Sequence, residues 1–329
     1  MKIAILGAGA WGTALALSFS TRHHCTLWGR NPADLAEIAA KRCNERYLPG
    51  IALADALVIE ADLAKALGEA DLALIATTTS GLGEAAQHVY SLRPGLPIIW
   101  ACKGFNLATG ELPHETLATI TAPQPAGYYG ALSGPSFARE VAQGLPTALT
   151  LACNDFDYAK QLSAALSSNS LRVYSNPDLI GVELGGALKN VMAIAAGLCD
   201  GMSLGNNARA ALITRSLAEI VRLGVAMGGR AETFMGLTGL GDLILTATGD
   251  LSRNRSVGVQ LARGATLSSI LASLGHVAEG VNSAQTALTL AQKHGIDMPI
   301  TGAVCAVLFQ QADPRETVKR LLARDPKAE

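Results

Sequence analysis

Short apolar runs alternate with helical patterns through the first half of the chain. Residues 2–6 and 25–28 have the apolar character of buried strands, whereas residues 11–20 and 32–42 have helical patterns. Further strand-like runs follow at residues 56–59, 71–76, 97–102, 127–132 and 147–152. This alternation predicts an α/β fold with a parallel, doubly wound sheet.

The pattern changes after Pro177, where the strand-like runs cease. Long segments rich in Ala, Leu and Ile, separated by Gly-containing turns, occupy residues 178–198, 208–228, 257–272, 281–294 and 299–311. Such segments predict a second, all-helical domain. The expected domains are therefore residues 1–185 and residues 186–329.

A glycine motif joins the first predicted strand to the first predicted helix. Gly7, Gly9 and Gly12 give the spacing G-x-G-x-x-G in this context, which favours dinucleotide binding over a plain glycine-rich turn. Gly7 permits the tight turn, Gly9 permits a pyrophosphate to approach the backbone, and Gly12 permits close packing of helix on strand. The helix start also offers free N–H groups to an anion. The same glycines argue against a signal peptide in the N-terminal apolar run.

The end of the second predicted strand bears on the choice of dinucleotide. It reads LWGRNP and lacks the acidic residue that holds the ribose hydroxyls in NAD sites. Arg30 lies about where that residue is expected and could pair with a 2′-phosphate. The sequence thus favours NADPH, with NADH also accepted as the open alternative. The structural alternative is that Arg30 is an ordinary surface arginine without a role in cofactor binding.

Two lysines raise the question of chemistry. Lys103 follows the predicted strand at 97–102, where a solvated lysine is the usual case. Lys189 and Asn190 interrupt the apolar segment GALKNVMAIAAG, and a buried lysine is costly unless it is paired or discharged. Lys189 is therefore either the working group of an enzyme or a structural cation whose stem lies along apolar surface while its ammonium reaches water.

Composition limits the classes of partner. The chain of 329 residues has a net charge of −1 and 5% aromatic residues, so a nucleic-acid partner is not expected. Its six cysteines and six histidines show neither a disulfide framework nor metal-ligand spacing. We expect a cytoplasmic protein that binds no metal. We also expect no membrane span, because Lys189 and Asn190 interrupt the best candidate.

A series of sequence blocks points to one family. The blocks are GAGAWGTALA, WGRN, YLPG, ACKGF, SGPSFAREVAQGLPTA, GVELGGALKNVMAIAAG, TFMGLTGLGDLILTATG, SRNR and AEGV. In this order they resemble bacterial NAD(P)-dependent glycerol-3-phosphate dehydrogenases along essentially the whole chain. The resemblance implies reduction of dihydroxyacetone phosphate to sn-glycerol 3-phosphate, the backbone donor for phospholipid synthesis. It also implies a Rossmann domain followed by a helical domain like that of 6-phosphogluconate dehydrogenase relatives.

The resemblance also implies roles for particular residues. The catalytic lysine of the family matches Lys189. Substrate contacts are implied for Lys103, Gly134, Ser136, Lys189, Asp242, Ser252, Arg253 and Asn254. Cofactor contacts are implied for Gly7, Gly9, Ala10, Trp11, Gly12, Arg30, Lys103, Ala138, Arg253, Val277 and Glu279.

The implied roles are chemically reasonable, although each has a structural alternative. Hydride transfer to a ketone builds negative charge on its oxygen, and a lysine whose pKa is lowered by burial can donate a proton there. Asp242 could orient that ammonium, although it would raise the pKa again, or it could simply cap a helix. Arg253 and its neighbours could clamp a phosphate or form a solvated basic turn. Ser136 could equally be a helix cap.

The sequence leaves two other functions open. A 3-hydroxyacid or 6-phosphogluconate-type dehydrogenase would share the architecture, but the SRNR block weighs against it. The second alternative is a protein that binds NADP(H) without turnover. Such a protein would tolerate an apolar residue at position 189, where this chain has a lysine, so this alternative is disfavoured. A homodimer is expected, because an apolar helical domain of this size often associates.

Overall fold

The computed structural model describes residues 1–121, 127–274 and 278–323. By internal packing the chain forms two compact units, one of Met1–Asn106 with Glu111–Glu183, the other of Leu107–Gly110 with Leu184–Glu329. The change from one unit to the other after Glu183 falls inside a helix. The roles assigned to residues 1–185 and 186–329 remain predictions.

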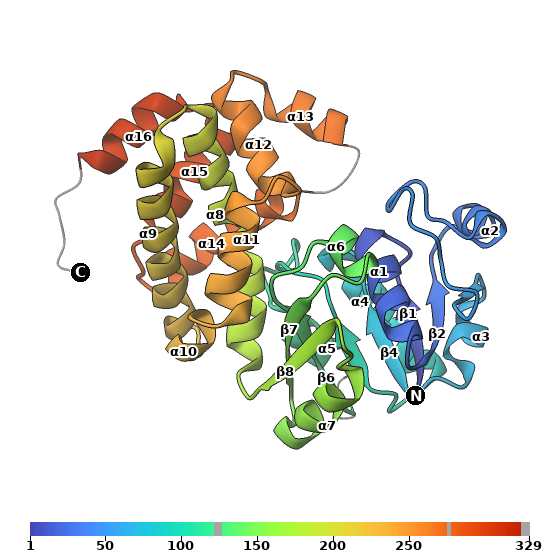
Figure 1. Ribbon diagram of the computed structural model, residues 1–329. Coiled ribbons are helices and arrows are strands. Elements are labelled where there is room, and N and C mark those ends of the chain that lie inside the picture. Colours follow the sequence, from blue (N-terminus) through green and yellow to red (C-terminus); the bar gives the residue numbers. More distant parts are fainter. Residues whose placement is uncertain (122–126, 275–277, 324–329) are drawn as a thin grey trace. The chain divides into compact units, whose positions relative to one another are not determined.

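The first unit is built on an eight-stranded sheet in the order β3-β2-β1-β4-β5-β6-β7-β8 (Figure 1). The strands are β1 (Lys2–Leu6), β2 (His24–Trp28), β3 (Val58–Glu60), β4 (Leu72–Ile75), β5 (Ile98–Trp100), β6 (Tyr129–Ser133), β7 (Thr147–Cys153) and β8 (Leu171–Asn176). Neighbours pair in parallel except β6 and β7, which pair antiparallel. The doubly wound sheet is confirmed, and the expectation that every strand is parallel is wrong at this one pair.

Helices cover both faces of this sheet. They are α1 (Ala10–Ser20), α2 (Pro32–Lys41), α3 (Leu63–Gly68), α4 (Thr79–Leu92), α5 (Pro113–Thr121), α6 (Ala138–Ala142) and α7 (Phe156–Leu166). Ile3 and Ile5 of β1 pack in a core with α1 and α7, whereas Ala4 and Leu6 pack in a second core with α4. Because successive side chains of a strand point to opposite faces, an apolar run such as KIAIL is required when both faces are covered.

The second unit is helical throughout the part that the structure describes. Most of α8 (Leu179–Gly201) belongs to it, followed by α9 (Gly205–Ala226), α10 (Ala231–Phe234), the π-helical segment η1 (Leu237–Gly241), α11 (Asp242–Thr248), α12 (Arg253–Ala262), α13 (Leu267–Leu274), α14 (Glu279–Lys293), α15 (Pro299–Phe309) and α16 (Pro314–Leu322). The single helix expected at 257–272 is wrong: α12 ends before Gly264, whose φ of +90° is left-handed and cannot continue a helix.

Helix α8 explains why the chain has one very apolar segment. By length and composition it is long enough and apolar enough to cross a membrane, contrary to the expectation that Lys189 and Asn190 exclude this. However, 89% of its most apolar window is buried inside the protein. A central helix surrounded by others must be apolar on all sides, so burial in the protein accounts for this composition.

Glu219 of α9 supplies a cap for α15. The residue before α15, Met298, makes no side-chain cap hydrogen bond. Glu219 is 1% exposed and accepts the Ile300 N–H at 2.6 Å and both the N–H and the hydroxyl of Thr301 at 3.1 Å. Burial raises the pKa of Glu219 to about 7, although these hydrogen bonds oppose the rise.

This carboxyl group should make stability depend on pH. The folded state holds its proton more tightly than the unfolded chain, so the free energy of unfolding should fall by up to about 3 kcal/mol as pH rises from 4.5 to about 7. Glu219→Gln should flatten that decline, whereas Glu84→Gln, on the exposed face of α4, should leave it unchanged. Urea unfolding at pH 5, 6, 7 and 8 measures the slopes; an unaltered slope in Glu219→Gln contradicts the assignment.

Candidate functional site

The glycine motif connects β1 to α1 as the sequence predicts. Gly7 has a φ of +129°, and a Cβ there would lie 2.6 Å from the Ala76 carbonyl oxygen. A Cβ on Gly12 would lie 1.9 Å from the carbonyl oxygen of Gly7. Gly9 differs, because its φ is −80° and, apart from the adjoining chain, no atom lies within 4 Å of the place a Cβ would occupy. The fold itself explains Gly7 and Gly12, whereas the space beside Gly9 is a cradle that a Cβ would partly fill.

The start of α1 offers polar groups beside that cradle. Gly9 is its N-cap residue and provides no side-chain cap, so Ala10 and Trp11 begin the helix. The indole Nε1 of Trp11 is buried and has no hydrogen-bond partner among the described residues. Trp11 and Ala138 pack against the same small core around Leu48 and Val141. An open helix start with room beside Gly9 fits the pyrophosphate of a dinucleotide.

Arg30 lies beyond the end of β2, next to the glycine loop. β2 ends at Trp28, whose carbonyl oxygen accepts the Gly7 N–H at 2.8 Å. The Arg30 side chain is exposed, and Asn31 caps α2 by accepting the Ala33 N–H at 3.1 Å. The arginine therefore stands at the strand end where a dinucleotide-binding sheet holds the adenosine ribose.

Three predicted substrate residues meet at one carbonyl group in the first unit. The Lys103 ammonium donates to the Gly134 carbonyl oxygen at 2.9 Å, and the Ser136 hydroxyl donates to the same oxygen at 3.0 Å. Gly134 has a φ of +132°, which favours glycine. The alternative that Ser136 caps a helix is wrong, because the N-cap residue of α6 is Phe137. Lys103 is partly buried rather than fully solvated.

A buried ion pair lies in the second unit. The Lys189 ammonium donates to Asp242 Oδ1 at 2.8 Å and to the Thr246 hydroxyl oxygen at 2.8 Å. Lys189 is 8% exposed and Asp242 is 1% exposed. The Thr246 hydroxyl in turn donates to Asp242 Oδ1 at 3.2 Å. The alternative that Lys189 extends its ammonium into bulk water is therefore wrong.

Close packing of backbone fixes Asp242. The residue follows η1, and a Cβ on Gly239 of that segment would lie 2.0 Å from the Phe234 carbonyl oxygen. A Cβ on Gly185 of α8 would lie 2.8 Å from the Thr238 carbonyl oxygen. π-Helical turns are rare and are frequently found at functional sites. The glycines of GVELGG and GLTGLG thus allow α8 and η1 to approach closely, which brings Asp242 to Lys189.

The SRNR block is the first turn of α12 rather than a free turn. Ser252 is its N-cap and accepts the Arg255 N–H at 3.2 Å, and Arg253 is exposed. Asn254 is 8% exposed; its amide donates to Asn190 Oδ1 at 2.9 Å and accepts the Gly280 N–H at 3.0 Å. Asn254 therefore links α8, α12 and the start of α14, where Glu279 is the first residue.

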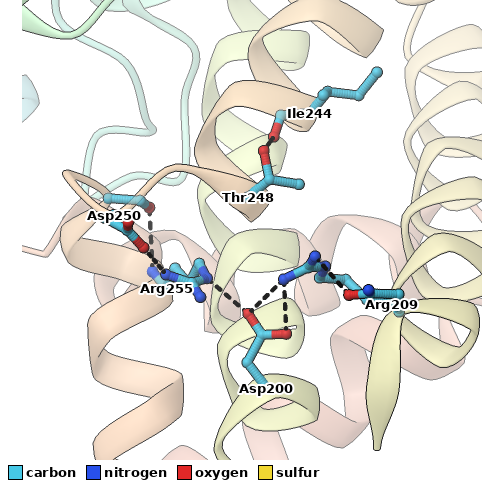
Figure 2. A network of polar contacts seen from close by, with 8 residues as sticks. Asp200, Arg209, Ile244, Thr248, Asp250 and Arg255 are labelled. Carbon is cyan, nitrogen blue, oxygen red and sulfur yellow. Dashed lines mark hydrogen bonds and ion pairs between the residues drawn. The ribbon is translucent and has the colours of Figure 1, made fainter.

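Ion pairs hold the other side of this turn (Figure 2). Arg255 Nε lies 2.7 Å from Asp200 Oδ2, and its Nη1 lies 3.0 Å from Asp250 Oδ1. Arg209 of α9 also pairs with Asp200, at 3.2 Å. Arg255 is thus engaged in structural pairs, whereas Arg253, two residues earlier, faces solvent. The basic character of the block divides into one structural cation and one exposed cation.

The structure adds residues that the sequence alone did not assign. Thr246 lies one helical turn after Asp242, so its spacing could have placed it beside Lys189. Asn190, which interrupts the same apolar segment, accepts the hydrogen bond from the Asn254 amide. Val277 lies outside the described residues. Within the described ranges, no three His, Cys, Asp or Glu side chains group as metal ligands.

Comparison with known proteins agrees with the resemblance. Residues 2–159 match the family described as NAD-dependent glycerol-3-phosphate dehydrogenase N-terminus, and residues 178–319 match its C-terminus. The chain is 54% identical to "Glycerol-3-phosphate dehydrogenase [NAD(P)+]" of Aromatoleum aromaticum and 56% identical to that of Thiobacillus denitrificans, over 100% of each chain.

A solved structure extends the comparison to the fold. The glycerol-3-phosphate dehydrogenase of Coxiella burnetii is 41% identical, with a TM-score of 0.93 over 98% of this chain and 99% of that one. The chain therefore belongs to the NAD-dependent glycerol-3-phosphate dehydrogenase family.

Proposed function

We propose that this protein reduces dihydroxyacetone phosphate to sn-glycerol 3-phosphate with a nicotinamide cofactor. Family membership supports the reaction class. The observation that carries the proposal furthest is the Lys189–Asp242 pair, in which an ammonium group is held at 2.8 Å from a carboxylate in a buried position. Such a fixed, water-poor cation suits a reaction that develops negative charge on a ketone oxygen.

Lys189 acts as the general acid in this proposal. When bound, the reduced cofactor supplies the hydride for the carbonyl carbon. The Lys189 ammonium gives a proton to the carbonyl oxygen, which yields the secondary alcohol and leaves a neutral amine that solvent reprotonates. Asp242 and Thr246 each accept a hydrogen bond from the ammonium, so they hold it in a fixed position from which it can serve as the proton donor. In the reverse reaction the amine serves as the base.

The first turn of α12 is suited to the phosphate group. Arg253 provides an exposed cation at the helix start, and the helix dipole favours an anion at the same place. Asn254 is hydrogen-bonded to Asn190, and Arg255 forms an ion pair with Asp200. These two contacts with α8 keep the first turn of α12 in one position. Ser252 and Asn254 remain proposed substrate contacts, as do Lys103, Gly134 and Ser136, which meet at one carbonyl group.

The cofactor is proposed to bind along the glycine motif, from Gly7 to Gly12, with Ala138, Lys103, Arg253, Val277 and Glu279 as further contacts. NADPH is the proposed preferred form, because Arg30 is exposed just after β2 and the stretch LWGRNP at the end of that strand contains no acidic residue. NADH is expected to serve less well. None of the proposed steps needs a metal.

Replacing Arg30 should test this preference. Arg30→Ala should raise the KM for NADPH by about 10-fold or more, which corresponds to loss of one charge-assisted hydrogen bond, with little change for NADH. Initial rates with each cofactor at saturating substrate give both values. Arg22→Ala, an exposed arginine before β2, is the matched control. An equal effect of Arg30→Ala on NADPH and NADH would remove the basis for the assignment.

Cofactor absorbance tests the reaction itself. NADPH should be oxidised when dihydroxyacetone phosphate is added and should remain stable without it. A panel of carbonyl compounds separates this activity from that of a 3-hydroxyacid or 6-phosphogluconate-type dehydrogenase. NADPH binding in calorimetry, without turnover of any phosphorylated ketone, would contradict the proposal and favour a non-catalytic binding protein.

The wider role follows from the product. We propose that sn-glycerol 3-phosphate made by this protein enters glycerophospholipid synthesis in the cytoplasm, and that the protein is a homodimer. The unit that contains the sheet is proposed to bind the dinucleotide, and the helical unit is proposed to supply the proton donor. Light scattering coupled to gel filtration would measure the oligomeric state.

A further inference from the structure

The buried side chain of Asn44 contacts the glycine loop in the first unit. Its amide Nδ2 donates to the Ala8 carbonyl oxygen at 3.0 Å and to the Thr13 hydroxyl oxygen at 2.8 Å. Asn44 is 1% exposed and Thr13 is 0% exposed. Ala8 lies between Gly7 and Gly9. Asn44, 36 residues later in the chain, therefore holds the Ala8–Gly9 peptide of the glycine motif by its hydrogen bond to the Ala8 carbonyl oxygen.

Asn44 is itself fixed by its own segment. Its Oδ1 accepts the Tyr47 N–H at 3.3 Å, and its carbonyl oxygen accepts the Leu48 N–H at 2.8 Å. Leu48 is 3% exposed and packs against Ala14 and Val141. Because Oδ1 and both amide hydrogens have partners, the orientation of the amide plane is determined.

This contact sets the direction of a neighbouring N–H group. In a trans peptide the C=O and N–H bonds point in opposite directions. The Ala8 carbonyl points toward buried Asn44, so the Gly9 N–H on the same peptide points away from it. Apart from the adjoining chain, no atom lies within 4 Å of a Cβ position at Gly9, so the loop has open space at this residue. Rotation of the Ala8–Gly9 peptide would break the bond to Asn44 and redirect the N–H.

We propose that Asn44 is a positioning residue of the cofactor site, which holds the Ala8–Gly9 peptide so that its N–H faces the pyrophosphate of the nicotinamide dinucleotide. The inference rests on the proposed cofactor role of the glycine loop. Asn44 does not touch the cofactor in this account; it acts through the backbone of Ala8 and the hydroxyl of Thr13.

Binding measurements with two substitutions test the proposal. Asn44→Ala should raise the Kd for NADPH by about 10-fold, the effect of one well-placed hydrogen bond. The KM for dihydroxyacetone phosphate and the kcat at saturating NADPH should change less than about 3-fold. Thr13→Val should raise the Kd in the same direction by a smaller factor, because it frees the amide to turn. The double variant should bind no more weakly than Asn44→Ala alone, since both changes remove one linkage.

A matched control separates positioning from general stability. Asn154 also donates to a loop carbonyl, that of Gly127 at 3.2 Å, and accepts the Tyr129 N–H at 2.9 Å. It contacts the amino end of β6, whereas the glycine loop follows the carboxyl end of β1 in the same sheet. Asn154→Ala should lower the melting temperature without changing the Kd for NADPH.

A third variant, Gly9→Val, separates failure of the proposed role of Asn44 from failure of the proposed cofactor site. If Gly9→Val leaves NADPH binding intact, the cofactor site is misplaced. If Gly9→Val abolishes binding while Asn44→Ala binds NADPH normally and only melts earlier, Asn44 is structural and the proposal fails. Should Asn44→Ala not fold, Thr13→Val decides alone: an unchanged Kd for NADPH overturns the positioning role.

Discussion

Lys189→Met should lower the kcat for dihydroxyacetone phosphate reduction by about 10²–10⁴-fold, the usual contribution of a positioned proton donor. Methionine keeps most of the side-chain volume, so the surroundings of α8 should stay packed. The Kd for NADPH should not change, because Lys189 is not among the proposed cofactor contacts. Steady-state rates and a fluorescence titration of NADPH measure the two effects separately.

Because Lys189 is paired with the buried carboxylate of Asp242, its replacement affects stability as well as turnover, and the two effects must be separated. Removing the ammonium leaves the Asp242 carboxylate, which is 1% exposed, without its cation, and such a change costs about 3–5 kcal/mol of stability. The double variant Lys189→Met/Asp242→Asn removes both charges and should recover much of that stability without recovering turnover. Restored turnover in the double variant would mean that Lys189 serves only to neutralise Asp242.

Arg253→Ala should reduce discrimination between phosphorylated and unphosphorylated substrate. The guanidinium is exposed at the first turn of α12, which Asn254 and Arg255 hold in place. We expect kcat/KM for dihydroxyacetone phosphate to fall by about 10–100-fold, the effect of losing a charged hydrogen bond, while the low value for dihydroxyacetone changes little.

The matched control for this change lies at the other end of the same helix. Arg263 is the exposed C-cap residue of α12, so Arg263→Ala removes the same charge without removing a cation from the helix start. Its kcat/KM for both substrates should stay near wild type. A similar fall in both variants would mean that the general charge of the unit, rather than contact with phosphate, favours the phosphorylated substrate.

Much of the sheet could be predicted from apolar runs, but its far edge could not. Strands β1 and β4 to β7 have apolar runs because both of their faces are covered. Strand β8 lies at the edge and reads LRVYSN, in which exposed Arg172 and Tyr174 alternate with buried Leu171 and Val173. This alternation is typical of a half-buried edge strand, a signal that a search for continuous apolar runs does not detect. The antiparallel pairing of β6 and β7 depends on the path of the connecting segment, which apolar periodicity does not report.

The residues of the candidate site likewise fall into those that a sequence pattern reveals and those that only the packing reveals. The apolar setting of Lys189 and the glycine spacing are local patterns, so both could be recognised along the sequence. Asp242 and Thr246 join Lys189 only because η1 and α8 pack backbone against backbone, with Gly185 and Gly239 at the contacts. Contacts with main-chain atoms leave no side-chain pattern, which is why the hydrogen bond from Asn44 to the Ala8 carbonyl oxygen was not foreseen.

The rate of hydride transfer in a single turnover tests the central claim most directly. Enzyme saturated with NADPH is mixed rapidly with dihydroxyacetone phosphate, and cofactor absorbance is followed in the wild type and in Lys189→Met/Asp242→Asn. If Lys189 donates the proton, transfer in the variant should be slower by about 10²–10⁴-fold, with unchanged affinity for NADPH. Transfer within a few-fold of the wild-type rate would contradict the role of Lys189.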